Sequence, residues 1–154
     1  MAVDFREMLK RPVMSVERPR PIPAGSYIAV QKSYKYDVAR YKAQDGSEIP
    51  IVRFTLQIQS ATDDVPPELL EGIKDLTSRI VSKEYELTDE RGLWGLRQYL
   101  EAAGAEGLEN GRSFHEAVEA DTNNKAYLIE VTATPSKKNP DDVFNNVGKV
   151  GKVT

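Results

Sequence analysis

The stretch that decides the fold runs from residue 25 to residue 60 and reads GSYIAVQKSYKYDVARYKAQDGSEIPIVRFTLQIQS. Both arms alternate apolar and polar residues with a period of two, which places successive side chains on opposite faces of a strand. Asp45-Gly46 separates the arms, and this pair is favoured where a turn needs a positive φ. The stretch therefore predicts a long β-hairpin. Its return strand begins at an edge or a bulge, because Pro50 has no N–H to donate.

The two faces of the return arm differ in polarity. One face is apolar throughout and predicts a core contribution from Val52, Phe54, Leu56 and Ile58. The opposite face is mostly polar and carries Ile51, Arg53, Thr55, Gln57 and Gln59. The outgoing arm mixes cations with tyrosines within a dozen residues, and this mixture is the main functional signal of the sequence.

Three further strands and three helices follow the hairpin, and the first of these helices is a short one that begins at Pro67. Residues 78–87 predict a third strand, with apolar side chains from Ile80, Tyr85 and Leu87. A helix is expected from a cap at Thr88 or Asp89 to Gly104, with Trp94 and Tyr99 widening its apolar face. Ser113-Phe-His-Glu116 matches a capping box and predicts a short helix. Alternation over residues 125–134 and 143–153 predicts the last two strands, and Gly148 and Gly151 suggest a bulge or a close backbone approach in the second of them.

This order of elements is that of a five-stranded OB-like barrel, a mainly β fold with one helix between strands three and four. Residues 24–154 are expected to form that OB-fold domain. Residues 1–23 are expected to form an extended, basic N-terminal arm, since four prolines between Pro12 and Pro23 hold the chain extended. Val3, Phe5, Met8 and Leu9 predict a short amphipathic turn at its start. Such an arm would touch nucleic acid, touch a neighbouring subunit, or cover the bottom of the barrel.

The charge distribution says more than the net charge of −3. Residues 84–121 hold ten acidic and three basic residues, whereas residues 1–60 hold ten basic and six acidic ones. A chain can attract phosphates through one face while remaining acidic overall, although helices also gather glutamate simply for solubility. No apolar run reaches the roughly 20 residues that span a bilayer, so no membrane partner is expected.

The residues that usually support catalysis are scarce. The chain has no cysteine and a single histidine, His115, in the first turn of a predicted helix. Asp121-Thr-Asn-Asn-Lys125 lacks the glycine and the final acid of a calcium loop, and residues 148–152 lack phosphate-loop spacing. We therefore expect no enzyme activity, no metal site and no cofactor.

Six segments resemble a family of bacteriophage single-stranded-DNA-binding proteins. They are Pro23–Tyr27, the polar and aromatic hairpin, Gly92-Leu-Trp-Gly-Leu, Tyr99–Gly104, Gly111-Arg-Ser-Phe and Phe144–Lys149. The likeness lies in their order and spacing across most of residues 23–150. It implies an OB fold and a protein that coats single strands during phage DNA replication, recombination or repair, in the cytoplasm of the bacterial host.

The expected mechanism is physical: cations bind phosphates and tyrosine rings stack on bases, with little dependence on sequence. The partner is single-stranded DNA, with a homo-oligomer and phage replication or recombination proteins as further candidate partners. The competing hypothesis is a phage structural protein of the capsid or tail, without nucleic-acid binding. The nucleic-acid-binding residues are expected to be Lys32, Tyr34, Lys35, Tyr36, Arg40, Tyr41, Lys42, Arg53, Lys137 and Lys138.

Overall fold

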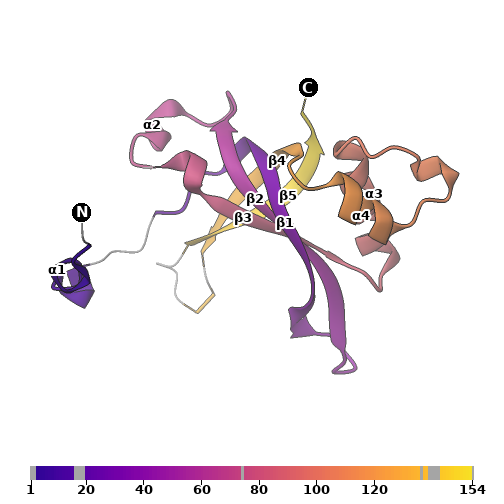
Figure 1. Ribbon diagram of the computed structural model, residues 1–154, viewed down its shortest axis with the longest axis horizontal. Helices are drawn as coiled ribbons and strands as arrows, with labels where there is room; N and C mark the ends of the chain where they lie inside the picture. The colour runs from indigo at the N-terminus through magenta and orange to yellow at the C-terminus, as the bar shows by residue number, and fades with distance from the viewer. Residues whose placement is uncertain (1–2, 16–19, 74, 136, 139–142, 154) are drawn as a thin grey trace.

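The computed structural model describes residues 3–15, 20–73, 75–135, 137–138 and 143–153 (Figure 1). The fold is built on a five-stranded antiparallel sheet with the strand order β3-β2-β1-β4-β5. The elements are α1 (Phe5–Met8), η1 (Val13–Ser15), β1 (Gly25–Lys42), β2 (Glu48–Ala61), α2 (Pro67–Leu70), η2 (Leu76–Ser78), β3 (Ile80–Glu86), α3 (Glu90–Ala102), η3 (Leu108–Asn110), α4 (Phe114–Asp121), β4 (Ala126–Pro135) and β5 (Val143–Lys152). The predicted mainly β fold, with a helix between strands three and four, is confirmed.

The β1–β2 hairpin is as long as the alternation predicts, and its far end projects beyond the sheet at the bottom of Figure 1. Gly46 closes the turn with a φ of 85°, a conformation that glycine adopts without steric cost. A register shift between Gln31 and Ser33 leaves Lys32 as an extra residue in β1. The bulge suggested for the last strand is also present, because Gly148 and Lys149 of β5 oppose the single residue Glu130 of β4.

The sheet curls without closing into a hydrogen-bonded barrel. Among the described residues, β3 pairs only with β2 and β5 pairs only with β4, so each presents one unpaired edge. Lys83 bridges the two edges, because its Nζ donates to the Val147 carbonyl oxygen at 3.3 Å. We call the space between these edge strands the seam.

Aromatic rings stack in the centre of the core. The Tyr99 ring lies between the rings of Phe54 and Tyr127, with centroids 4.1 and 4.3 Å away. Tyr99 comes from α3, whose N-terminus is capped by the side chain of Asp89, one of the two predicted caps. Gly92 lets this helix approach β3, since a Cβ there would lie 2.1 Å from the Glu86 carbonyl oxygen. The stack therefore joins α3 to β2 and β4.

Two apolar predictions were wrong. Ile80 is 61% exposed, because its partner across the ladder is Gln57, on the face turned away from the core. Trp94 is 56% exposed and packs its ring against the Arg97 guanidinium at the outside of α3. Ile80 is next to the buried Val81 in the sequence, and Trp94 is two residues before the buried Leu96, but neither side chain turns toward the core.

A buried polar network ties β1 to the helices. The amide of Gln31, which is fully buried, donates to Thr122 Oγ1 at 2.8 Å and to Asn123 Oδ1 at 2.9 Å. Its Oε1 accepts the Tyr99 hydroxyl at 2.6 Å. Burial raises the pKa of the Tyr99 phenol far above its usual value, so this hydroxyl stays a donor.

Replacing Tyr99 with phenylalanine should lower the free energy of unfolding by about 1–3 kcal/mol, because the Gln31 Oε1 loses its partner in the core. Thermal and urea denaturation followed by circular dichroism measure this loss. Tyr41→Phe is the matched control. It removes a hydroxyl bonded to Glu86 at the surface, and the change should stay within about 0.5 kcal/mol. Equal stability of Tyr99→Phe and the wild type would contradict the assignment.

The N-terminal segment forms the predicted short turn, α1, capped by the Asp4 side chain. Its apolar side chains, Phe5 and Met8 among them, are exposed. The segment meets the sheet at Ile22, which is buried and held by two hydrogen bonds of 2.9 Å with the Asn145 side chain. No helix among the described residues is long and apolar enough to cross a membrane.

Candidate nucleic-acid interface

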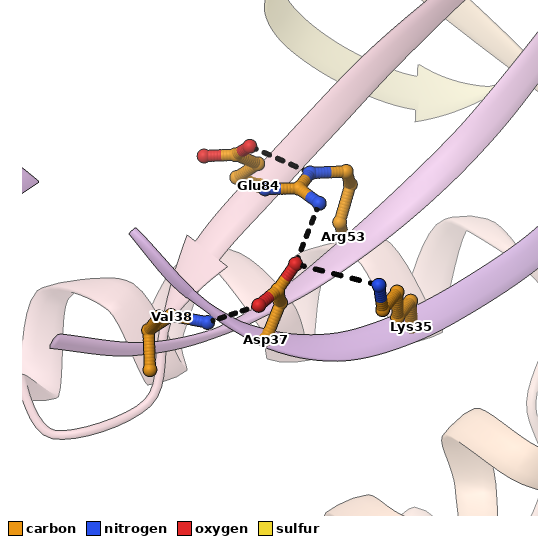
Figure 2. Close-up of polar contacts among 5 residues, drawn as sticks. All are labelled: Lys35, Asp37, Val38, Arg53 and Glu84. Carbon is orange, nitrogen blue, oxygen red and sulfur yellow. Dashed lines mark hydrogen bonds and ion pairs between the residues drawn. The ribbon is translucent and has the colours of Figure 1, made fainter. Parts of the chain in front are cut away.

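A row of charged side chains crosses β1, β2 and β3 on the face turned away from the core (Figure 2). Strand pairing sets Lys35 opposite Arg53 and Arg53 opposite Glu84. The Arg53 Nε donates to Glu84 Oε1 at 2.8 Å, and its Nη1 donates to Asp37 Oδ2 at 3.0 Å. Lys35 lies 3.7 Å from the same Asp37 oxygen. We call these four residues the outer row; it holds two positive and two negative charges.

The ion pairs of the outer row keep Arg53 and Asp37 charged. The hydrogen bonds to Glu84 and Asp37 raise the pKa of the Arg53 guanidinium, so it is a permanent cation. The Val38 backbone N–H and the Arg53 guanidinium lower the pKa of Asp37. Asp37 therefore stays ionised at pH values where an ordinary carboxyl group becomes protonated. The outer row loses the negative charge of Asp37 only when the pH falls through this lowered pKa. A phosphate reaching Arg53 at neutral pH competes with two carboxylates.

The tyrosines of β1 do not all share that face. Tyr34 and Tyr36 pair with Phe54 and Val52, which places both rings on the core side of the hairpin. Tyr34 is half-buried and packs against the core cluster. Tyr36 lies beyond the core and is 43% exposed, with its hydroxyl 3.0 Å from His115 Nδ1 on α4. The structure therefore does not bring these two rings together with Lys35 and Arg53, and their contact with DNA stays a prediction.

Tyr41 lies near the end of β1 and is 55% exposed. Its hydroxyl donates to Glu86 Oε1 at 2.7 Å, which directs the ring toward β3. The carboxylate of Glu86 raises the pKa of this phenol, which stays neutral at physiological pH. Its neighbours in sequence, Arg40 and Lys42, are both exposed. The end of β1 thus offers a solvent-accessible ring with a cation on either side of it in the sequence.

The remaining predicted cations lie at separate places. Lys32 is exposed at the bulge of β1, where the extra residue leaves the regular ladder. Lys137 and Lys138 are exposed just after the end of β4, in the sequence that leads to β5. The predicted closing of a groove by these two lysines stays a prediction.

The seam holds a groove of about 880 Å³ that sequence reasoning missed. Its lining joins the end of β1 to both unpaired edges and consists of Pro21, Arg40, Tyr41, Arg53, Ile80–Glu84 and Val143–Val147. Phe144 is 44% exposed there. Lys83 is half-buried in the same lining, and burial lowers the pKa of its ammonium group. Phe144 stands between Val143 and Asn145 in the sequence, and no pattern in this stretch marks its side chain as exposed.

A second groove of about 650 Å³ lies between α3, η3 and α4. Its two arginines are already paired: Arg97 with Glu101 at 3.0 Å, and Arg112 with Asp121. Glu109 adds a further negative charge to the lining. This groove is therefore less suited to a polyanion than the seam.

The described residues offer no grouping of three or more histidine, cysteine or acidic side chains that would hold a metal ion. The hairpin and the seam present cations, carboxylates and aromatic rings beside the two strand edges. No protein-family model matches the chain, and no curated protein matches it either. The resemblance to the phage family accordingly stays a prediction.

Proposed function

We propose that this protein binds single-stranded DNA without sequence preference and carries out no reaction on it. One observation carries the proposal: Tyr41, an exposed ring, lines the seam groove together with Arg40 and Arg53. Cations beside an exposed aromatic ring suit a polynucleotide whose bases are unpaired, because every base offers a face for stacking. A duplex keeps its bases stacked inside and offers only its phosphates.

The binding energy would come from two sources. Phosphates near Lys35, Arg40 and Lys42 release condensed counterions, so affinity should depend on salt. Base stacking on Tyr41 would add about 1–3 kcal/mol per base. The carboxylates of the outer row repel phosphates and so weaken the attraction between the cations and DNA. This keeps the non-specific binding of duplex weak.

The fold that we propose is the OB fold. The order β3-β2-β1-β4-β5 becomes that of an OB barrel once β3 and β5 lie side by side. The Lys83 bridge to Val147 and the helix between β3 and β4 support this assignment. Together with the resemblance of the sequence, the proposed OB fold supports a role in phage DNA replication, recombination or repair in the bacterial host.

A structural role in the capsid or tail is the second candidate. One observation favours it: Phe5, Met8 and Leu9 of the N-terminal segment expose apolar side chains suited to a subunit contact. A structural protein would form large particles and would not bind oligonucleotides at low salt.

A fluorescence-anisotropy titration tests the proposal. Labelled oligo-dT of about 20 nucleotides is long enough for one or more OB-type sites. The protein should bind it at least ten-fold more tightly than a duplex of the same length. Equal affinity for the duplex, or no binding at low salt, would contradict the proposal.

A further inference from the structure

The N-terminal segment, residues 3–15, presents apolar side chains to solvent. Among the described residues, six of the exposed large apolar side chains belong to this segment: Val3, Phe5, Met8, Leu9, Val13 and Met14. None of the four residues of α1 is buried. Exposed apolar side chains gathered in one place mark a contact with another molecule.

The spacing of these side chains is that of a helix that binds in a groove. Met8 and Leu9 lie three and four residues after Phe5, so the three side chains share one face of the turn that α1 forms. Arg6 and Glu7 lie between them in the sequence and belong to the other face. A helix that binds in an apolar groove uses anchors at this spacing.

A groove of suitable size lies between α3, η3 and α4, and we call it the helical groove. Its volume of about 650 Å³ is within the range of pockets that hold a ligand of several side chains' size. Each of the three elements contributes an apolar side chain to the lining: Leu100 is buried, Leu108 is half-buried, and Phe114 is 39% exposed. The lining can therefore contact the apolar face of a short helix.

The net charges of the segment and of the helical region have opposite signs. Residues 3–15 hold three basic and two acidic residues, whereas residues 89–121 hold eight acidic and three basic ones. The two arginines of the helical groove are paired with Glu101 and Asp121, and Glu109 adds an exposed carboxylate. Charges of opposite sign orient two partners more than they strengthen the complex. The segment is thus complementary to the helical groove in both shape class and charge.

The two surfaces lie at opposite ends of the molecule. Figure 1 shows α1 at one end and α3 with α4 at the other. The segment leaves the sheet at Ile22, which the Asn145 side chain holds at the start of β5. A contact between different surfaces of two copies is heterologous, and it leaves one segment and one groove free to bind further copies.

We propose that the N-terminal segment of one copy binds in the helical groove of a second copy, with Phe5, Met8 and Leu9 as its apolar anchors. The copies associate head to tail into an open array that lengthens as the protein concentration rises. This contact goes beyond the proposed function, because it requires no DNA.

Light scattering over a series of protein concentrations tests the contact. The mass of the wild type should rise above twice the 17.2 kDa of one chain. Phe5→Ser together with Met8→Ser removes two anchors from exposed positions, so its mass should stay at that of one chain with the melting temperature unchanged. Leu69→Ser is the matched control, since it removes a similarly exposed side chain from α2 and should associate like the wild type. Association of the segment variant to the same extent as the wild type would overturn the contact.

Mixing two variants tests the head-to-tail arrangement. Phe114→Gln removes an exposed ring from the helical groove and should stay at the mass of one chain by itself. Mixed with the segment variant, its intact segment meets an intact groove, so the mass should rise to that of two chains and no further. A contact between two identical surfaces could not be restored in this way. A mixture without association would overturn the arrangement.

Crosslinking provides a measurement that leaves the anchors and the ring in place. The chain has no cysteine, so two variants with one cysteine each can be joined only at the chosen positions. Lys10→Cys lies beside the anchors, and Asn110→Cys lies in the groove lining. A short thiol crosslinker should join these two variants at least ten-fold more than Leu69→Cys and Asn110→Cys. Equal yields for both pairs would overturn the contact.

The outcomes distinguish the contact from the proposed function. If the wild type associates as expected but binds no oligo-dT, the proposed function fails and the contact stands. If every variant and the wild type keep the mass of one chain, the contact is refuted, and the binding of oligo-dT by the wild type still decides the proposed function. If the segment variant loses affinity for a short oligo-dT while its association is unchanged, the segment contacts DNA and the contact between copies is refuted.

Discussion

Replacing Tyr41 and Lys42 together by alanine should weaken the binding of oligo-dT by about 10- to 100-fold and leave the melting temperature nearly unchanged. The change removes one stacking ring and one phosphate contact from the end of β1. Both side chains are exposed, and the one hydrogen bond that is lost joins Tyr41 to Glu86 at the surface. Anisotropy titrations of both proteins at the same salt concentration measure the effect.

Trp94→Ala is the control for this prediction. It removes an exposed ring of similar accessibility from α3, on the opposite side of the fold from α1 in Figure 1, and it should leave the affinity within two-fold. A large fall in melting temperature for the double variant would mean that Tyr41 is a structural residue. Unchanged affinity of the double variant for oligo-dT would mean that the end of β1 does not contact the DNA.

The outer row leads to a prediction of opposite sign. Asp37→Asn together with Glu84→Gln should tighten the binding of oligo-dT by about 10-fold at low salt, because both changes remove a negative charge beside Arg53. The guanidinium keeps neutral hydrogen-bonding partners and becomes available to a phosphate. The gain should shrink as salt is added, since screening weakens the attraction between exposed charges.

The matched control removes two negative charges at another place in the fold. Glu101→Gln together with Glu109→Gln changes the net charge equally, beside α3 and η3, and breaks one comparable ion pair with Arg97. Its affinity should change by less than two-fold. An equal gain in affinity for both double variants would mean that binding depends on the net charge of the protein and not on the charges beside Arg53.

Local pattern was sufficient to predict most of the fold. The alternation of the hairpin, the Asp45-Gly46 turn and the Asp89 cap each depend on residues close in sequence, and all three are present. The open seam could not be predicted in this way, because it depends on whether β3 and β5, about 60 residues apart, come close enough to pair. Period-two alternation also did not say which face of β3 is turned inward, and Ile80 lies on the face turned away from the core.

The candidate site was predictable in its residue types more than in its geometry. Cations and tyrosines on β1 were recognisable, but alternation alone did not say which face is inward, so Tyr34 and Tyr36 were grouped with Lys35. The partners of Arg53 lie on two neighbouring strands, and only the register reveals them. Phe144 and Lys83 meet only across the seam, and no short-range pattern links them.

The salt dependence of oligo-dT binding by the wild type tests the central claim most directly. With four to six exposed cations on phosphates, raising salt from about 50 to 200 mM should weaken binding by roughly 50- to 300-fold, while the affinity stays well above that for duplex at every salt concentration. An affinity that does not change with salt, or one that is equal for single strand and duplex, would contradict the account.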